Sequence, residues 1–283
     1  MPGQSATAAA GAETTLPLAA LTALLTERYR PEGVRDRIVV PHLADPALNE
    51  LVAGLVLGFT RRPGRHNRYM PVPGEHSVRT ADFTDFLDWY GHEYQIAVVR
   101  VADVRTGALL DVPAIAAHAR AEGVSCVWDW TGAVDWVDPS VLAAVGEDPV
   151  FWSTHTSLLD GTRHPAGVAG SSPLPVPAAP LAAPAERREA ARRLADLLAG
   201  TGAVLAPHLG TPPPLPDDQL PLIVLDAGRR ADEIVAAAAR SAALTAAVCD
   251  GGRVTLVPDP AAADTALTAL AADIRDLLST KGA

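Results

Sequence analysis

Two stretches near the middle of the chain carry side chains that could do chemistry. Asp129 ends a predicted buried strand at 124–129, and His155 and Thr156 directly follow another predicted strand at 149–154. An imidazole changes its protonation state near neutral pH, so His155 could act as a general acid or base. In parallel sheets functional side chains collect at the carboxyl ends of strands, where we expect a pocket around these residues.

Each of these residues also has a structural interpretation. His155, Asp160 and His164 could be metal ligands, but the spacing H-x4-D-x3-H matches no known metal motif, so structural or solvated histidines are favoured. Asp129 is interpreted first as a vestigial or strand-end residue, with a retained catalytic or binding role as the alternative. Four tryptophans of this region are interpreted as core or interface residues, with stacking on a ligand as the alternative: Trp128, Trp130, Trp136 and Trp152.

Composition narrows the choice of partners and of compartment. The chain has 283 residues and a net charge of −10, and a single lysine, Lys281, occurs among its 23 basic residues. This charge argues against binding to nucleic acid or to anionic membranes, and we expect neither partner. We find no apolar stretch that could span a membrane, no secretory signal, and two cysteines that are too few for a disulfide framework. A cytoplasmic protein is therefore expected.

The predicted elements divide the chain into two domains. Short apolar strands alternate with helices in the first half, which favours a parallel sheet in an α/β layer. Residues 61–76 are interpreted as a solvated loop, with an arginine-lined anion site as the alternative, and the prolines of 163–185 exclude a sheet or a helix interior. We predict a flexible N-terminus, a large α/β domain, a proline-rich linker and a small α+β domain, at 1–13, 14–170, 171–184 and 185–283.

The segment 96–167 resembles a known group of enzymes. A strand is followed by RTGALLD, a helix, a glycine, a strand ending in Trp-Asp, and a strand ending in Thr-His. This order and spacing resemble the central part of class V aminotransferase-fold enzymes, the fold type I pyridoxal-phosphate group. Kynureninases are the most similar, with isopenicillin N epimerases and cysteine desulfurases close behind. The resemblance implies a reduced aminotransferase-like large domain, a small C-terminal α+β domain, and a dimer.

The resemblance also implies roles for individual positions. Asp129 matches the acid that pairs with the pyridinium nitrogen of the cofactor, and Thr14 and Thr15 match polar residues on its phosphate side. His155 holds the position before the Schiff-base lysine, and Thr156 stands where that lysine should be. A threonine hydroxyl cannot form an imine, and no shift of the alignment restores a lysine before the last three residues of the chain. A His or Gln that the family usually places three residues after the acid is replaced by Gly132.

The missing amine decides the functional prediction. We expect no cofactor, with noncovalent pyridoxal phosphate as the less favoured alternative, and Thr14, Thr15 and Thr156 as vestigial cofactor positions. The favoured hypothesis is a kynureninase-like pseudoenzyme with a binding, scaffold or regulatory role, in a homodimer or in a heterodimer with a related active enzyme. The alternative is a repurposed lyase, hydrolase or transferase that acts on a small amino-acid-related metabolite through Asp129 and His155. The family reaction, cleavage of a β-carbon bond in an amino acid, is favoured least.

Overall fold

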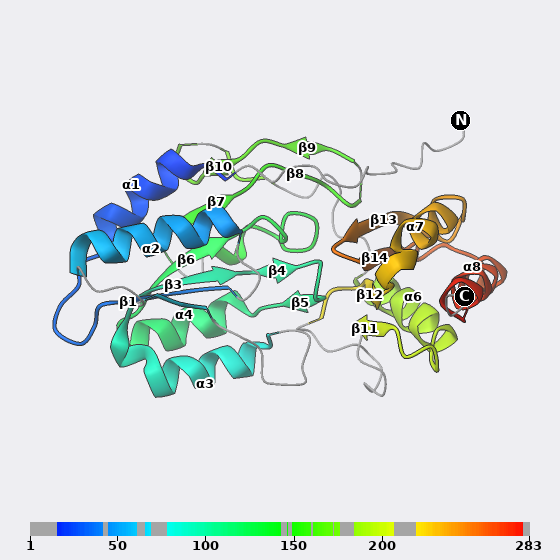
Figure 1. Cartoon of the computed structure of the whole chain (residues 1–283), viewed down its shortest axis with the longest axis horizontal. Coiled ribbons are helices and arrows are strands. Elements are labelled where there is room, and N and C mark those ends of the chain that lie inside the picture. Colours follow the sequence, from blue (N-terminus) through cyan, green and yellow to red (C-terminus); the bar gives the residue numbers. More distant parts are fainter. Residues whose placement is uncertain are drawn as a thin grey trace.

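The described residues form two main sheets, each flanked by helices, and two short two-stranded sheets (Figure 1). We call the two parts the large unit (Leu18–Val168) and the small unit (Pro184–Ser279). This structure is a computed structural model, and it describes residues 16–41, 45–60, 66–68, 78–142, 146, 149–159, 161–171, 173–175, 184–206 and 219–279. Within these ranges no helix has both the length and the apolar character that a bilayer crossing requires.

The large unit is built on a mostly parallel sheet. Its strands run in the spatial order β10-β7-β6-β3-β1-β2, and every neighbouring pair is parallel except β7 with β10. This topology confirms the predicted α/β class, in which continuous apolar runs such as IAVV of β3 are buried on both faces. The strands are β1 (Arg37–Val40), β2 (His66–Arg68), β3 (Tyr94–Arg100), β6 (Ser125–Asp129), β7 (Val150–Trp152) and β10 (Gly167–Val168).

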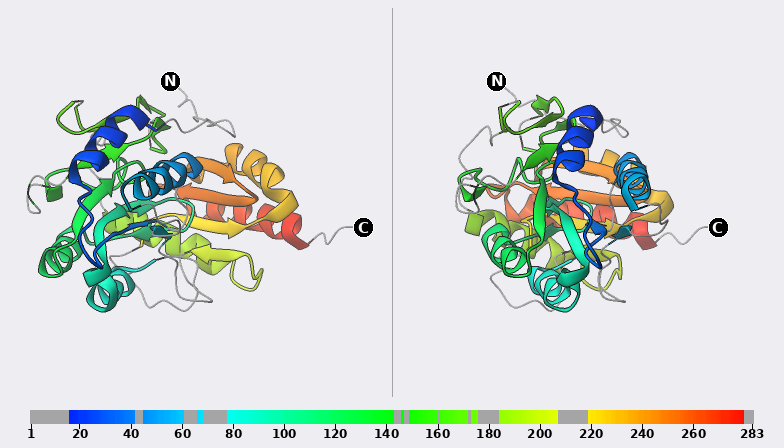
Figure 2. Two further views of the ribbon diagram at one scale, coloured as in Figure 1. Left: turned by 60° about the vertical axis from the view of Figure 1, so that its left-hand side comes forward. Right: turned by 90° about the vertical axis from the view of Figure 1, so that its left-hand side faces the viewer.

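Helices cover both faces of this sheet, and Figure 2 shows the blue helices on one face and the cyan and green helices on the other. The helices are α1 (Leu18–Arg28) and α2 (Pro46–Thr60) on one face, and α3 (Thr80–Tyr90) and α4 (Val112–Ala121) on the other. In β3 (Tyr94–Arg100), the side chains of Ile96 and Val98 belong to the core between the sheet and helices α1 and α2. Those of Ala97 and Val99 belong to the core on the opposite face, under α3 and α4. The period of two along a strand thus separates two cores.

Local sequence signals define the ends of α4. The Asp111 side chain accepts a hydrogen bond from the backbone N–H of Ala114 at 3.0 Å, which caps the helix, and Pro113 lies in the first turn. Gly123 ends the helix with a φ of 67°, a conformation that side chains rarely adopt. β6 (Ser125–Asp129) begins two residues after Gly123. The cap and the glycine therefore set where this strand begins, and Asp129 is its last residue.

The small unit is an antiparallel sheet with helices on one face. Its strand order is β11-β12-β14-β13, and the turn at Gly251 and Gly252 joins the last two strands as a hairpin. The helices share one core with Ile223, Leu225 and Val254 of the sheet. This arrangement confirms the predicted α+β unit. Its elements are α6 (Pro184–Leu197), β11 (Val204–Ala206), β12 (Ile223–Asp226), α7 (Ala231–Ala239), β13 (Leu244–Asp250), β14 (Arg253–Pro258) and α8 (Asp264–Ser279).

A hairpin of the large unit packs on the helix-free face of the small sheet. It consists of β4 (Ala102–Asp103) and β5 (Ala108–Leu109). Gly107 lies in its turn with a φ of 77°, and a Cβ atom there would lie 2.8 Å from the Cβ of Ala206. The Thr255 hydroxyl donates to the Val104 carbonyl at 2.8 Å. Because Leu222 and Val224 also join the core of the large unit, the two units share buried apolar surface.

Two predictions based on proline and glycine content are wrong in part. β2 forms inside the predicted loop 61–76 and pairs with β1, and β10 forms inside the proline-rich stretch 163–185. A proline removes the backbone donor only at its own position, and both strands are at sheet edges, where one side needs no partner. Pro165 itself lies outside the strands, and its carbonyl accepts a hydrogen bond from Trp152 Nε1 at 2.8 Å.

Candidate functional site at the carboxyl edge of the large sheet

The last residues of β3 and β6 form an ion pair at the carboxyl edge of the large sheet. Arg100 and Asp129 are register partners, and strand alternation points both side chains to the face covered by α1 and α2. Arg100 Nε donates to Asp129 Oδ2 at 3.0 Å. The backbone N–H and the hydroxyl of Thr131 donate to Asp129 Oδ1 at 3.1 and 2.6 Å. Both carboxylate oxygens of this buried aspartate are therefore hydrogen-bonded.

The guanidinium of Arg100 links this pair to a second carboxylate. Its Nη1 donates to Asp103 Oδ2 at 3.0 Å, and Asp103 also accepts from Arg105 Nη2 at 3.1 Å. Burial of the guanidinium disfavours its charge, but the carboxylates of Asp129 and Asp103 outweigh burial and raise the pKa of Arg100. The four side chains alternate in charge, so the network is electrically balanced.

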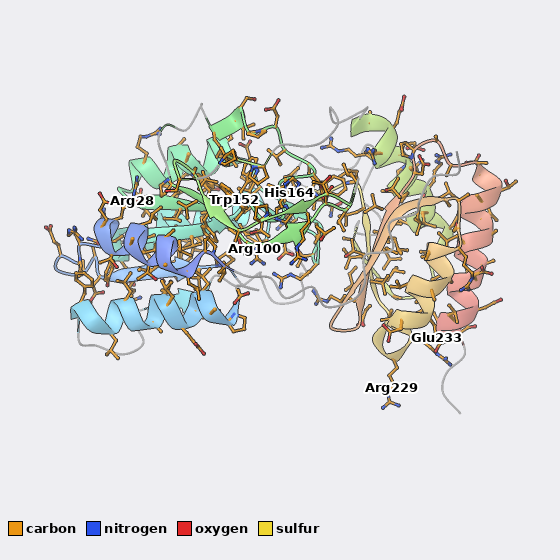
Figure 3. All side chains as sticks on the ribbon, turned by 90° about the horizontal axis from the view of Figure 1, so that it is seen from above. Arg28, Arg100, Trp152, His164, Arg229 and Glu233 are labelled. Atoms are coloured by element: carbon orange, nitrogen blue, oxygen red, sulfur yellow. The ribbon has the colours of Figure 1, made fainter. Side chains whose placement is uncertain are left out.

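A hydrogen-bonded chain leads from Asp129 to His155, the first residue of β8 (His155–Thr156). Thr131 Oγ1, which donates to Asp129, also accepts from the backbone N–H of Ser153 at 2.9 Å. The Ser153 carbonyl is 2.9 Å from His155 Nδ1. The structure thus connects the two residues that the sequence singled out, through backbone and hydroxyl groups. In Figure 3, Arg100, Trp152 and His164 are labelled in the part of the large unit that is nearer the small unit.

His155 is held as a neutral imidazole. Partial burial lowers the pKa of His155 below its ordinary value of 6.5, and the nearby His164 lowers it further, although the Ser153 carbonyl and the charge of Asp135 oppose the shift. The two imidazole rings stack with centroids 4.9 Å apart and an interplanar angle of 23°. His155 Nε2 is buried and has no hydrogen-bond partner among the described residues. Among the described residues this ring nitrogen therefore has capacity for one further hydrogen bond.

The backbone of β4 fills the space where the family resemblance expects a His or Gln side chain. Gly132 lies three residues after Asp129, and a Cβ atom at this position would lie 2.0 Å from the carbonyl oxygen of Ala102. Because that contact is with backbone, no side-chain movement can relieve it. The glycine is therefore required by the packing of β4, and a His or Gln could not take its place without moving this strand.

The structure brings together some of the predicted site residues and leaves others untested. Thr14, Thr15, Asp160 and Lys281 lie outside the described residues. Thr156 belongs to β8 (His155–Thr156), which pairs with β9 (Arg163–His164). Among the described residues no cluster of three metal-binding side chains occurs. The core interpretation of the tryptophans is confirmed, because all four are buried in the large unit: Trp128, Trp130, Trp136 and Trp152.

Sequence reasoning missed Arg100, Asp103 and Thr131. Arg100 ends the run QIAVVR in the same way that Asp129 ends VSCVWD, and two parallel strands that end in opposite charges predict an ion pair at their shared edge. This signal was available from the sequence. The role of Thr131 was not, because it depends on how the turn after β6 folds back towards Ser153.

The described residues do not fit an imine-linked pyridoxal phosphate. The acid for the pyridinium nitrogen is present, but Arg100 and Thr131 already engage its oxygens. The position after His155 is Thr156, whose hydroxyl cannot condense with an aldehyde. The site thus offers a carboxylate and an imidazole, without an amine.

Comparisons with known proteins agree with this fold. No protein-family model matches the chain. A kynureninase from Salinispora tropica is 32% identical over 148 residues, which cover 52% of this chain and 34% of that enzyme. The chain thus matches about a third of the length of this curated relative.

Solved structures cover nearly the whole chain. A NifS-like protein superposes with a TM-score of 0.60 at 13% identity, over 95% of this chain and 82% of that chain. The cysteine desulfurase CsdA from Escherichia coli gives 0.58 at 15% identity, over 94% and 78%. An alanine–glyoxylate aminotransferase from Nostoc sp. gives 0.54 at 14% identity, over 94% and 81%. These similarities confirm the fold of class V aminotransferases and the predicted resemblance to kynureninase.

The same comparisons correct one expectation. We expected no cofactor, yet the kynureninase and the solved structures that this chain resembles are pyridoxal-phosphate-dependent enzymes. The expectation was wrong because it equated the lysine with the cofactor. The lysine supplies the covalent link, whereas phosphate and ring contacts bind the cofactor independently of it, so the absence of lysine does not exclude pyridoxal phosphate.

Proposed function

We propose that this protein is a kynureninase-like pseudoenzyme that performs no imine chemistry with its own side chains and has a binding, scaffold or regulatory role. The observation that carries the proposal is Thr156 at the position after His155, in a chain whose single lysine is Lys281. The resemblance implies a reaction that begins with an amine of the protein bound to the cofactor aldehyde. Without that amine, the side chains of residues 1–280 cannot carry out this first step.

The charge arrangement supports the same proposal. In a catalytic site of this group the acid is expected to stabilise a positively charged ring nitrogen. Here the partly buried Arg100 already neutralises Asp129, and Asp103 shares the same guanidinium. A buried ion pair of this kind stabilises the folded chain only while both partners remain, so the arrangement serves structure.

Borohydride trapping tests the proposal. The purified chain is mixed with pyridoxal phosphate, reduced with borohydride, and mapped by peptide mass spectrometry, with a Lys281→Arg variant as the matched control. We expect no reduced adduct on any side chain other than adventitious modification of Lys281. Noncovalent binding is measured separately by thermal shift, because ligand at ~100 times its dissociation constant stabilises a protein by about 2.7 kcal/mol. A stoichiometric adduct that the Lys281→Arg variant loses, together with turnover of kynurenine, would contradict the proposal.

We also propose that the protein works as a dimer, with a second copy or with a related active enzyme. The support is the family resemblance, since class V enzymes of this fold dimerise across their active sites. Sedimentation equilibrium of the purified chain distinguishes a homodimer from a monomer. A chain that stays monomeric alone and also with a co-expressed kynureninase would contradict this part of the proposal.

A repurposed enzyme is the second candidate, and one observation favours it. His155 Nε2 is buried without a partner at the end of a hydrogen-bonded chain that starts at Asp129. A neutral imidazole in such a place can accept a proton from a bound metabolite. If a ligand such as an aromatic amino acid stabilises the protein, and both Asp129→Asn and His155→Ala abolish that stabilisation, this candidate gains over the first. Stabilisation that survives both substitutions would remove it.

A further inference from the structure

The outward side of α3 exposes an aromatic pair at the opposite edge of the large sheet from the candidate site. Trp89 is 69% exposed and Tyr90 is 49% exposed, whereas each of the other four tryptophans is 6% exposed or less. Exposure of a whole indole ring to water is unusual, and such aromatic groups are enriched at protein interfaces. α3 lies at the lower edge of the large unit in Figure 1, and the chain enters β3 only four residues after Tyr90, at the amino end of that strand.

Two carboxylates that have no partner among the described residues lie beside this aromatic pair. Asp85 is one helical turn before Trp89, and Asp88 is three residues after Asp85, so all three side chains share the exposed side of the helix. No hydrogen bond or ion pair joins either carboxylate to another residue in the part of the chain that the structure describes. Asp82 of the same helix differs, because it is bound by Arg79 at 3.0 Å.

The position of these charges is unfavourable for the isolated protein. Asp85 and Asp88 repel each other at a spacing of three residues. Asp88 lies in the last turn of α3, where the helix dipole is negative, and this turn contains no basic residue. The half-buried Glu122 adds a third carboxylate, because Gly91 leaves room for its side chain: a Cβ at position 91 would lie 2.8 Å from that of Glu122. The surface thus concentrates negative potential around an aromatic ring.

The aromatic pair is held by the core beneath it. The ring of Phe86 lies 5.7 Å from that of Tyr90 and 5.3 Å from the buried Tyr94. Tyr90 in turn contacts Trp89 edge to face, with centroids 6.5 Å apart. Anchoring of this kind lowers the entropy cost of binding, because the ring needs no further ordering.

We propose that this face of α3, formed by Asp85, Asp88, Trp89 and Tyr90, binds an arginine-bearing segment of a partner protein. A planar guanidinium can stack on the indole of Trp89 and donate hydrogen bonds to Asp85 and Asp88 at the same time. Lysine has a compact ammonium group that stacks less well, and an apolar partner would bury the carboxylates without compensation. Anionic lipid and nucleic acid are repelled by the same charges.

Tryptophan fluorescence can report binding at this face. Trp89 is exposed and the other four tryptophans are buried, so acrylamide should quench mainly the fluorescence of Trp89. A nine-residue peptide of alternating arginine and glycine is titrated against the full chain, with the lysine analogue as the comparison. We expect the arginine peptide to protect Trp89 from acrylamide and to bind more tightly than the lysine peptide. With a labelled peptide, Trp89→Ala should weaken binding at least about fivefold, the effect of an interface residue that contributes measurably to affinity, whereas Trp89→Phe should weaken it less.

A charge-matched control separates this surface from the overall negative charge. Asp85→Asn with Asp88→Asn should weaken binding of the arginine peptide at least about threefold, since each carboxylate contributes to the cation site. Asp232→Asn with Asp273→Asn, which changes the net charge equally on exposed parts of α7 and α8, should leave binding unchanged. All four positions are exposed, and thermal melts verify that the variants fold.

Three results would overturn the proposal. These are equal weakening by both double variants, no effect of Trp89→Ala, or equal binding of the arginine and lysine peptides. Self-association of the wild-type protein that Trp89→Ala removes would assign the face to a second copy instead. Because α3 is remote from Asp129 and His155, failure here leaves the outcome of the borohydride experiment unaffected.

Discussion

Charged side chains are placed differently at the two edges of the large sheet. At the carboxyl edge, the buried Asp129 and the partly buried Arg100 and Asp103 bind one another in a balanced network. At the amino edge, Asp85 and Asp88 are exposed and lack partners among the described residues. Buried charges must be paired to be tolerated, whereas exposed ones need not be. The two edges therefore differ in what a substitution should do: removing one charge at the carboxyl edge leaves its partner uncompensated, whereas removing charges at the amino edge should cost little.

The largest effect should come from removing one partner of the buried pair. Arg100→Ala leaves the Asp129 carboxylate buried without its cation, and we expect a loss of about 3–5 kcal/mol in the free energy of unfolding. Urea titration followed by circular dichroism measures this loss. Arg100→Met combined with Asp129→Leu removes both charges and should be more stable than Arg100→Ala alone. If the double variant is the less stable of the two, the pair does not behave as a buried ion pair.

A smaller loss should follow from adding one methyl group to the carboxyl edge. Gly132→Ala places a Cβ atom against the Ala102 carbonyl, and we expect overpacking to cost about 1–3 kcal/mol. The matched control is Gly54→Ala in α2, where no atom lies within 4 Å of the new Cβ. This helix-interior substitution should stabilise the protein by roughly 0.5–1 kcal/mol. Equal responses in urea titration would show that the carboxyl edge is not closely packed at Gly132.

The pH dependence of stability should report His155. Burial lowers the pKa of His155 in the folded chain below the value of 6.5, so the unfolded chain binds the proton more readily. The stabilising contribution is therefore complete above about pH 6.5 and is lost as the pH falls towards the lower folded-state pKa. His155→Gln should flatten the curve of urea midpoints between about pH 7 and pH 5. His92→Gln, at an exposed position, is the control, and an identical flattening there would refute the assignment.

The smallest effect should come from the amino edge. Asp85→Asn with Asp88→Asn removes a like-charge pair from the end of a helix, and we expect a gain of a few tenths of a kcal/mol that disappears in high salt. Thermal melts at low and high ionic strength measure it. Asp82→Asn should instead destabilise the protein, because Asp82 bonds the backbone and the side chain of Arg79. A loss of stability in the double variant would mean that these carboxylates do have partners.

Much of the fold could be predicted from local patterns. The apolar runs at β3 and β6, the Asp111 cap and Gly123 placed those elements to within a few residues, because each signal acts on neighbouring backbone. The short strands β2 and β10 could not be predicted. Each is at a sheet edge, and its pairing depends on a neighbour that is distant in sequence rather than on its own hydrophobic period.

The candidate site was predictable in part for the same reason. Asp129 and His155 could be found from their positions after apolar strands and from the family resemblance, while the Arg100 pair was overlooked. The hydrogen-bonded chain through Thr131 and Ser153 joins segments 22 residues apart, and it exists only because the turn after β6 folds back over β7.

By itself the sequence determined that residues 1–280 contain no lysine side chain. A chain whose single lysine is Lys281 has no amine to offer a cofactor from the large sheet, whatever its fold, because covalent chemistry depends on residue type. Only the tertiary structure decided what the remaining charges do. Arg100 contacts Asp129 because parallel pairing sets their strands in register. Asp85 and Asp88 have no partner within the described ranges, because α3 exposes them to water. Whether a charged side chain is paired or exposed depends on how close other segments of the chain lie in space, and the order of residues alone does not give those distances.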